Sequence, residues 1–307
     1  MSIPEKCPLC SSGPAKQSVV TSHVYGKRNK RSSAFFHCKN CDVRYQFPSL
    51  SEEEEVLFYT EEFESFMSSR SGESGGWLKA EQHVEANQKT YQRRIKYLSS
   101  FLEPKMNILE VGCSSGFMLY PLINDGHNCV GIEPSGVFSN FLSDNGIEVY
   151  DSLDNYKKIN ESQSFFDLIM HYFVLEHISD PINFLKSQLE LISSNGKIIF
   201  EIPNVADPLA SIYDIPAFER FYWSLAHPWY FSESSLDFLL SQLGVKYEIH
   251  RDQRYDLSNH IIWARDGKPG GMERFTSKIG IDIEEQYKKA LVKSGYCDTL
   301  IAVVYKY

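Results

Sequence analysis

The sequence contains no continuous apolar run of the ~18–20 residues that a membrane-spanning helix requires. Its N-terminal segment, MSIPEKCPLC, lacks the apolar core of a signal peptide. Both absences predict a cytoplasmic protein. Positive charge is also scarce. The chain has 31 Lys and Arg but 40 Asp and Glu, which gives a formal charge of −9. Non-specific nucleic-acid binding relies on neutralising phosphates, so this balance disfavours such a partner, and the basic cluster 27–31 is interpreted as a solvated loop tip.

Cysteine is sparse as well, but its placement is informative. Of the seven cysteines, four form two C-x-x-C motifs, Cys7 with Cys10 and Cys38 with Cys41. Each motif can present two thiolates to one ion, so together they predict a structural Zn²⁺ site in a ribbon over residues 1–47. A redox site of the thioredoxin type would need only one such motif. The other three cysteines, Cys113, Cys129 and Cys297, follow apolar patterns and are expected in the core.

The predicted ribbon is too small to bury a large core, so its folding should depend on the metal. Residues 33–38 are expected to form the strand that leads into the second motif. His23 and His37 are alternative ligands, although four cysteines already complete a tetrahedral site. No open coordination position is implied, and the ion is assigned no catalytic role.

The central motif of the chain is Asn-Ile-Leu-Glu-Val-Gly-Cys-Ser-Ser-Gly-Phe at residues 107–117. It is typical of a buried strand, a tight glycine turn and a helix. A second apolar strand follows and ends on Glu133-Pro134. This layout predicts a nucleoside-binding α/β domain, in which the glycines allow close approach of the backbone and Glu133 accepts hydrogen bonds from two ribose hydroxyls.

The details of the turn separate two cofactor classes. A dinucleotide site favours G-x-G-x-x-G, whereas this chain has Gly112-x-x-x-Gly116 with Ser114 between. Glu110 at the strand end would repel a pyrophosphate but suits the ammonium of an amino acid. The pattern therefore favours S-adenosylmethionine over a nicotinamide cofactor.

Two further segments are also typical of apolar strands, FDLIMHYFVLEHISDP at 166–181 and NGKIIFEIPN at 195–204. With LEVGCSSGFML and GIEPS they make residues 78–307 resemble the class I S-adenosylmethionine-dependent methyltransferases. The alternative is a set of packed strands in some other α/β enzyme. The resemblance implies an α/β, Rossmann-like, mostly parallel sheet with an antiparallel C-terminal strand. It also implies cofactor-binding roles for Glu110, Gly112, Cys113, Ser114, Gly116, Glu133, Pro134 and Asp151, with Asp151 facing the adenine amine.

The region between the ribbon and this domain, 48–77, is predicted to be a helical linker or lid. Ser51 is the expected N-cap of a helix that begins with four glutamates. Residues 68–77 have the composition of a flexible segment. A long helix is expected over 79–102, and its Tyr91 and Arg94 are interpreted as core or surface residues rather than cofactor contacts.

Two histidines are candidates for catalysis. His177 follows the predicted strand 167–174, and ligands of open parallel sheets lie beyond the carboxyl ends of strands. His227 lies in an aromatic insertion, about 205–232, whose His-Pro-Trp-Tyr-Phe-Ser run resembles the family signature H-x-x-Y-F-S. Each could act as a general base, and each could equally be a packed structural histidine.

The substrate region is less distinctive. Tyr222 and Tyr230 accompany His227, while Asn259 and His260 are placed on a strand-like stretch, 245–263, either as substrate contacts or as plain polar residues. Helices are expected over 233–243, capped by Ser232, and over 283–294, before a final strand at 297–305. Similar sugar C-methyltransferases carry Tyr-Glu-His where this chain has Leu225-Ala226-His227, so O- or N-methylation is expected instead.

Three functions are therefore compatible with the sequence. A ribbon followed by this linker and a methyltransferase domain resembles a bacterial subfamily that acts on nucleotide-linked sugars and surface-glycan precursors, which implies a small sugar-like acceptor. An RNA methyltransferase would use the ribbon for RNA and would have a basic face. A non-catalytic methyltransferase-like binding protein would retain the cofactor without transferring a methyl group.

Overall fold

The computed structural model describes residues 3–26, 33–71, 77, 79–160 and 165–306. The predicted basic cluster 27–31 and residues 72–76 of the predicted flexible segment 68–77 lie outside these residues. Two compact units are present, and each draws on several parts of the chain. One comprises Met1–Ser49, Phe173–Leu185 and Phe200–Val303, and the other Leu50–Tyr172, Lys186–Ile199 and Val304–Tyr307. The predicted domain boundaries at residues 47 and 77 remain sequence-based expectations.

A seven-stranded sheet has the strand order β10-β11-β8-β7-β4-β5-β6 and is mostly parallel, with an antiparallel C-terminal strand. The predicted α/β, Rossmann-like fold class is therefore confirmed. Its strands are β4 (Asn107–Val111), β5 (Asn128–Ile132), β6 (Glu148–Tyr150), β7 (Phe166–Tyr172), β8 (Ile192–Pro203), β10 (Lys246–Asp252) and β11 (Thr299–Tyr305). A second sheet has the order β1-β2-β3-β9, with β1 (Gln17–Thr21), β2 (Ala34–Cys38), β3 (Arg44–Phe47) and β9 (Trp229–Tyr230).

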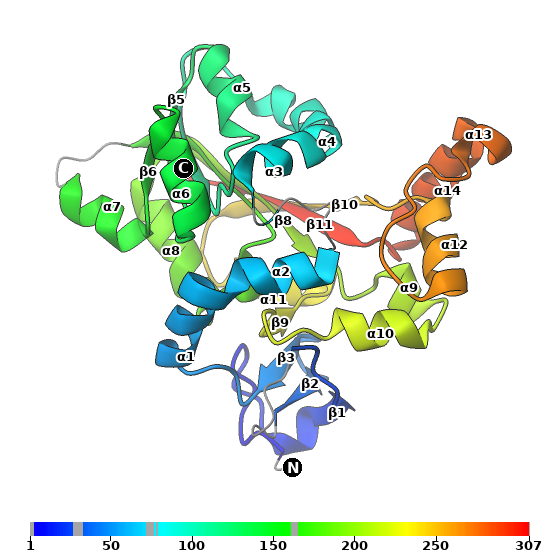
Figure 1. The fold of residues 1–307 in the computed structure, drawn as a ribbon. Coiled ribbons are helices and arrows are strands. Elements are labelled where there is room, and N and C mark those ends of the chain that lie inside the picture. Colours follow the sequence, from blue (N-terminus) through cyan, green and yellow to red (C-terminus); the bar gives the residue numbers. More distant parts are fainter. Residues whose placement is uncertain (1–2, 27–32, 72–76, 78, 161–164, 307) are drawn as a thin grey trace. The chain divides into compact units, whose positions relative to one another are not determined.

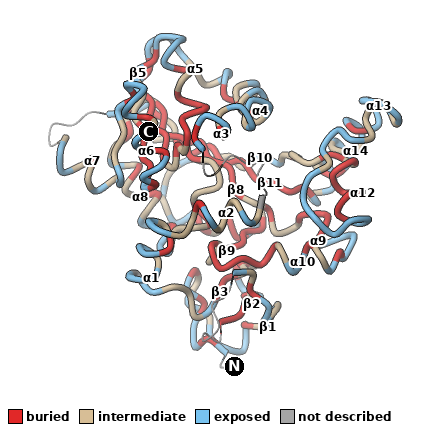
Figure 2. Tube along the Cα trace, in the orientation of Figure 1, coloured by how far each residue is buried: buried red, intermediate tan, exposed pale blue. Residues whose placement is uncertain are grey.

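In the unit that begins at Leu50, β4 pairs in parallel with both β5 and β7, so it is a central strand. Its residues from Ile108 to Val111 are all buried, as expected for a strand covered on both faces. Figure 2 colours the buried residues of the described chain red. Helices α5, α6 and α7 pack beside β5 and β6 (Figure 1). The bounds in this unit are α1 (Glu52–Leu57), α2 (Phe63–Ser71), α3 (Ala80–Ala86), α4 (Gln88–Leu98), α5 (Leu119–Asn124), α6 (Gly136–Asp144) and α7 (Leu153–Ile159).

The other unit contains the β1-β2-β3-β9 sheet and a group of helices. Their bounds are α9 (Pro208–Ser211), α10 (Pro216–Tyr222), α11 (Glu233–Ser241), α12 (Leu257–Asp266), α13 (Thr276–Ile279) and α14 (Ile281–Ser294), while α8 (Pro181–Leu191) is shared between the two units. Short 3₁₀ turns occur at η1 (Pro14–Lys16), η4 (Ser99–Phe101) and η5 (Leu175–His177), and a π-turn at η2 (Phe58–Glu62). Among the described residues, no helix combines the length and apolar character that crossing a membrane requires.

Local capping chemistry accounts for several helix starts. Ser51 and Glu54 form a reciprocal capping box at α1, in which each side chain bonds the backbone N–H of the other. Ser232 caps α11 by accepting from the Ser235 backbone N–H at 3.2 Å. The predicted caps at Ser51 and Ser232 are therefore confirmed.

Two expectations about secondary structure are wrong. The predicted helix over 79–102 is interrupted at Asn87, whose backbone (φ −99°, ψ 8°) ends α3 and begins α4. The predicted strand over 245–263 ends at Asp252, and α12 follows from Leu257. The physical reason is Asp256, whose Oδ1 accepts from the Asn259 backbone N–H at 2.8 Å and caps a helix. Ile262 and Trp263 of this helix are buried, whereas Ile261 is exposed.

Candidate functional site

The glycine turn after β4 is built from left-handed backbone positions. Gly112, Ser114 and Gly116 have φ values of 70°, 45° and 73°. Positive φ at Ser114 is uncommon for a residue with a side chain and is typical of functional turns. A Cβ on Gly116 would lie 2.5 Å from Leu142 Cδ2, so the turn is also packed closely against α6. The predicted glycine positions are therefore required by backbone conformation and, at Gly116, by space.

We expect Gly116→Ala to cost more stability than Gly126→Ala. Both glycines have positive φ, but a Cβ on Gly126 would meet nothing within 4 Å. Gly126→Ala should therefore lose about 1 kcal/mol of unfolding free energy from strain, and Gly116→Ala roughly 2 kcal/mol more from overpacking. Urea denaturation of the two variants measures the difference. Equal losses of unfolding free energy would show that the Leu142 side chain moves aside without a cost in stability.

Glu133 follows β5 and is held by two backbone donors from different segments. Its Oε2 accepts from the Ser114 N–H at 2.7 Å, and its Oε1 accepts from the Ser135 N–H at 2.9 Å. Each oxygen keeps a further lone pair for a ligand donor. Burial raises the pKa of Glu133 to about 7, although the two backbone hydrogen bonds oppose this rise. The structure thus brings Glu133 and Ser114 together, as the sequence predicted for one site.

Glu110 lies in β4 and is 2% exposed. Its Oε2 has no hydrogen-bond partner among the described residues. Burial raises the pKa of Glu110 well above its usual range, while the nearby Arg94 guanidinium opposes that rise. A buried carboxylate of this kind is stabilised by a cationic group, which the ammonium of an amino-acid moiety provides.

The remaining predicted cofactor residues have different surroundings. Cys113 is buried, and its Sγ would lie 2.6 Å from a Cβ on Gly131, so the thiol packs tightly against β5. Asp151 is exposed directly after β6 and accepts from the Ser152 hydroxyl at 3.0 Å. Pro134 stands between Glu133 and Ser135, whose hydroxyl accepts from the Phe138 N–H at the start of α6. The cofactor roles of these three residues remain predictions.

Sequence reasoning missed several residues around this turn. His83 of α3 is 4% exposed, and its Nδ1 lies 2.8 Å from the Ser115 hydroxyl. Burial lowers the pKa of His83 to about 4, and Arg94 adds to that effect. The Ser135 hydroxyl also donates to the Glu64 carboxylate of α2. The sequence carried no signal for these contacts, because neither α2 nor α3 contains a motif that points to residues 114–135.

In the other unit, a carboxyl group and two imidazoles converge. The side chains of Glu176, His177 and His227 place one possible ligand atom each within 4.8 Å of the others. The two imidazole centroids are 4.6 Å apart and nearly perpendicular. His177 donates from Nδ1 to the Ala226 carbonyl at 2.7 Å, which leaves Nε2 as the basic nitrogen of its neutral ring. The two histidines that the sequence predicts as candidate bases are therefore neighbours. Glu176, which the sequence did not indicate, lies with them.

Glu176 is 1% exposed, and neither of its carboxyl oxygens has a hydrogen-bond partner among the described residues. Burial raises its pKa to about 8, with a smaller opposing effect from the Arg254 guanidinium. Arg254 stacks 4.0 Å from the centroid of the Phe173 ring, and Phe173 has φ +58°. A strained residue directly after β7 is a feature that sequence reasoning could not detect.

We expect the cofactor-free protein to lose stability as the pH rises from about 5 to 8. Burial raises the pKa of Glu133 to about 7 and that of Glu176 to about 8. The folded state therefore binds these protons more tightly than the unfolded state, and the stability they contribute is lost as the pH rises through those values. The slope should reach about 1.4 kcal/mol per pH unit for each group. Urea denaturation across this range should show a flatter slope for Glu176→Gln and an unchanged slope for the exposed control Glu190→Gln.

The four predicted substrate residues are all buried. Tyr222 donates from its hydroxyl to the Asn204 carbonyl at 3.1 Å, and the Tyr230 hydroxyl donates to the Tyr222 carbonyl. Asn259 donates from Nδ2 to the Gly270 carbonyl at 2.7 Å. His260 lies 2.5 Å from the Tyr287 hydroxyl through Nδ1, and burial lowers its pKa to about 4. Their roles in substrate binding remain predictions.

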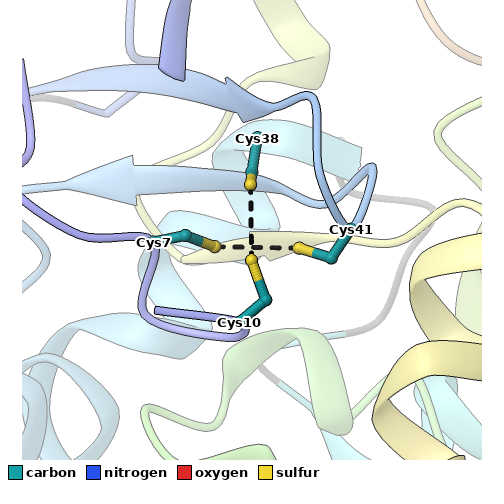
Figure 3. A group of neighbouring side chains, drawn as sticks. All are labelled: Cys7, Cys10, Cys38 and Cys41. Carbon is teal, nitrogen blue, oxygen red and sulfur yellow. Dashed lines mark hydrogen bonds between the residues drawn. The ribbon is translucent and has the colours of Figure 1, made fainter. Parts of the chain in front are cut away.

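The four cysteines of the two C-x-x-C motifs converge on one point (Figure 3). Cys7 and Cys41 have sulfur atoms 3.7 Å apart, and those of Cys10 and Cys38 are 3.6 Å apart. Four sulfurs around a tetrahedral ion with bonds of about 2.3 Å would be separated by roughly 3.8 Å, so this set fits such an ion. His37 instead contacts Asp42 at 2.8 Å, and His23 contacts the Arg220 carbonyl. Neither histidine belongs to the sulfur cluster.

A glycine turn after one parallel strand and a fixed carboxylate after the next define the site of a nucleoside-binding α/β protein. A family profile described as "Methyltransferase domain" matches residues 83–248, which is more than half of the chain. The chain belongs to this family of methyltransferase domains.

Similarity to individual proteins is more distant. A ubiquinone biosynthesis O-methyltransferase of Ruegeria sp. is 24% identical over 167 residues, which cover 52% of this chain and 66% of that protein. The enzyme of the same name from Colwellia psychrerythraea is 29% identical over 104 residues, or 32% of this chain and 42% of that protein. The chain thus spans less than two thirds of the length of these curated relatives. A SAM-dependent methyltransferase from Archaeoglobus fulgidus has a TM-score of 0.48 and 16% identity, covering 74% of this chain and 97% of that chain.

Proposed function

We propose that this protein transfers a methyl group from S-adenosylmethionine to a small-molecule acceptor. The observation that carries the proposal is Glu133, a buried carboxylate fixed by the backbone N–H groups of Ser114 and Ser135 at the end of β5. When bound, the cofactor supplies a methyl group activated on a sulfonium, so the protein chiefly has to bind, orient and exclude water.

The residues present fit this cofactor. Glu133 would accept hydrogen bonds from both ribose hydroxyls, because each oxygen keeps a free lone pair. Glu110, whose buried Oε2 has no hydrogen-bond partner in the described part of the chain, would hold the ammonium of the methionine moiety. Gly112 and Gly116 allow the backbone to approach the ligand, and Asp151 is proposed to accept from the adenine amine. Membership of the methyltransferase-domain family supports this assignment.

The acceptor group is proposed to be a hydroxyl. A hydroxyl needs a general base to become a good nucleophile, and a neutral amine does not. His177 and His227 are the candidate bases, because their rings lie 4.6 Å apart and His177 bonds the Ala226 carbonyl through Nδ1, so that Nε2 is the basic nitrogen of its neutral form. Curated relatives with the printed name O-methyltransferase support this preference.

We further propose that the acceptor is sugar-like. A cleft of about 340 Å³ is lined in part by Ser179 and Trp229. These residues stand two positions after His177 and His227 in the sequence. Its lining combines apolar and polar side chains, which suits a sugar ring that has both C–H faces and hydroxyls. The lining residues are Pro8, Leu9, Ser179, Asp180, Pro181, Ile182, Asn183 and Trp229.

The four cysteines are proposed to hold a structural Zn²⁺ ion. The sulfur separations of 3.6 and 3.7 Å support this proposal. Elemental analysis of the purified protein should find one zinc per chain, and Cys38→Ser should lose it. Cys129→Ser, which changes a cysteine outside the cluster, should retain the ion. If neither the natural protein nor Cys129→Ser contains zinc, the assignment is refuted.

The proposed function is tested with methyl-labelled S-adenosylmethionine and separate pools of nucleotide sugars, other small metabolites, RNA and protein. Label in the nucleotide-sugar pool supports the full proposal. Label only in another small-metabolite pool supports methyl transfer but refutes the sugar-like acceptor. Label in RNA refutes the small-molecule acceptor, and cofactor binding without label in any pool favours a non-catalytic binding protein.

A further inference from the structure

The N-terminal sheet contains one strand from far along the chain. Strands β1, β2 and β3 come from the ribbon, whereas β9 follows directly after His227. β9 pairs antiparallel with β3, with Arg44 opposite Tyr230 and Tyr45 opposite Trp229. Both strands belong to the same compact unit. The ribbon therefore continues as one hydrogen-bonded sheet into the chain that carries His227.

A second attachment lies on the other side of His227. The Tyr25 N–H donates to the Trp223 carbonyl at 2.7 Å, and the Leu225 N–H donates to the Tyr25 carbonyl at 2.9 Å. Beyond His227, the Gln46 N–H donates to the Pro228 carbonyl at 2.8 Å. The short turn 225–227 is thus held at both ends by the ribbon backbone.

Aromatic packing reinforces these backbone contacts. The Phe35 ring of β2 lies 5.2 Å from the Trp223 ring and 5.4 Å from the Tyr230 ring, centroid to centroid. All three side chains are buried. The Tyr230 hydroxyl accepts from the Ser224 N–H at 3.0 Å and so ties β9 to the start of the turn. We call this set, formed by Tyr25, Phe35, Trp223 and the β3–β9 pair, the ribbon seam.

The turn 225–227, which the ribbon seam holds, includes His227 and contacts His177. His227 is its last residue, and the Ala226 carbonyl accepts from His177 Nδ1 at 2.7 Å. That hydrogen bond keeps the proton of neutral His177 on Nδ1 and leaves Nε2 basic. A shift of the turn would therefore move His227 and also remove the contact that selects the tautomer of His177.

We propose that the ribbon positions His227 and His177 through the ribbon seam, and that Phe35 is a positioning residue for methyl transfer. This inference rests on the function proposed above. It assigns the ribbon an effect on the rate of the chemical step, without an effect on affinity for the cofactor. It also gives the four-cysteine cluster a purpose, because Cys38 ends β2 and Cys41 precedes β3 in the hairpin that bears the seam.

The test compares Phe35→Leu with Phe36→Leu. The two phenylalanines are adjacent on β2 and both 0% exposed, but they face opposite sides of the sheet. Phe36 packs on Tyr45 and Phe47 of β3, whereas Phe35 packs on Trp223 and Tyr230, which flank the turn 225–227. Both variants should lower the melting temperature to a similar extent. Only Phe35→Leu should reduce kcat, by about 10-fold or more, because small misplacements of a catalytic group are costly. Affinity for S-adenosylhomocysteine should be unchanged in both.

Two measurements on the same variants do not depend on activity. Imidazole ¹⁵N spectra should show His177 as the Nδ1–H tautomer in the natural protein and in Phe36→Leu, and as a mixture in Phe35→Leu. Hydrogen exchange should be faster over residues 223–231 in Phe35→Leu and after removal of metal with a chelator. Equal losses of kcat in both variants, or an unchanged His177 tautomer in Phe35→Leu, would overturn the proposal. If the natural protein methylates no acceptor, the proposed function fails, and the spectra and exchange rates still decide the role of the seam.

Discussion

Glu133→Gln is expected to weaken the binding of S-adenosylhomocysteine by about 100-fold. The carboxylate would accept two hydrogen bonds from the ribose, and a hydrogen bond to a charged group contributes about 1.5–3 kcal/mol. Glutamine has almost the same shape, but its amide carries donors on one end. That end would face the N–H of either Ser114 or Ser135, which now donate at 2.7 and 2.9 Å. The substitution therefore removes ligand contacts and also disturbs the turn that surrounds them.

Isothermal titration calorimetry measures this effect directly, and circular dichroism checks that the variant is folded. The matched control is Glu190→Gln on α8, whose carboxylate is exposed and bonds the Lys157 ammonium at 2.8 Å. The control should bind the cofactor product as the natural protein does. If the Glu133→Gln variant binds with natural affinity, Glu133 does not bind the ribose. The proposed function would then lose its main support.

His227→Ala and His177→Ala are each expected to lower kcat by about 10²- to 10⁴-fold, the usual contribution of a general acid–base group. Their affinity for S-adenosylhomocysteine should be unchanged, because neither residue belongs to the turn after β4. The matched control is His250→Ala on β10, whose imidazole is exposed and lies 3.4 Å from Glu248. Steady-state kinetics with the acceptor identified by labelling gives the three values of kcat.

The two histidines should also be strongly non-additive. Their rings are 4.6 Å apart and share the turn that ends at His227. Once one is removed, removal of the other should change kcat much less than it does in the natural protein. A fully additive double variant would show that they act independently. Natural kcat in both single variants would exclude a histidine base and leave an acceptor that needs no deprotonation.

Several features of the fold followed from local chemistry and were predictable for that reason. The capping box at Ser51 and Glu54 uses residues three positions apart, so the sequence displays it directly. The same holds for the positive-φ glycines after β4 and for the two C-x-x-C motifs. Asp256 was overlooked, although it caps α12 in the same way. The stretch 245–263 is strand-like in sequence, but the Asp256 cap begins a helix within it.

The contacts that complete the candidate sites were not predictable, because their partners are far apart in the chain and carry no motif. Ser115 meets His83, and Ser135 meets Glu64, only after α2 and α3 have packed. Glu176 is adjacent to His177, but the sequence does not reveal that its carboxyl group is buried with no hydrogen-bond partner among the described residues. Burial is a property of the packed molecule, and so are the pKa changes that it causes.

By itself, the sequence determined the α/β class, the glycine turn after β4 and the grouping of four cysteines into two C-x-x-C pairs. It did so because strand burial, left-handed turns and short ligand spacings are encoded over a few consecutive residues. Only the tertiary structure decided that His177 and His227 are neighbours and that β9 joins the sheet of β1, β2 and β3. These contacts join segments separated by long stretches of chain, and their geometry is set by backbone pairing and aromatic packing that no local pattern records.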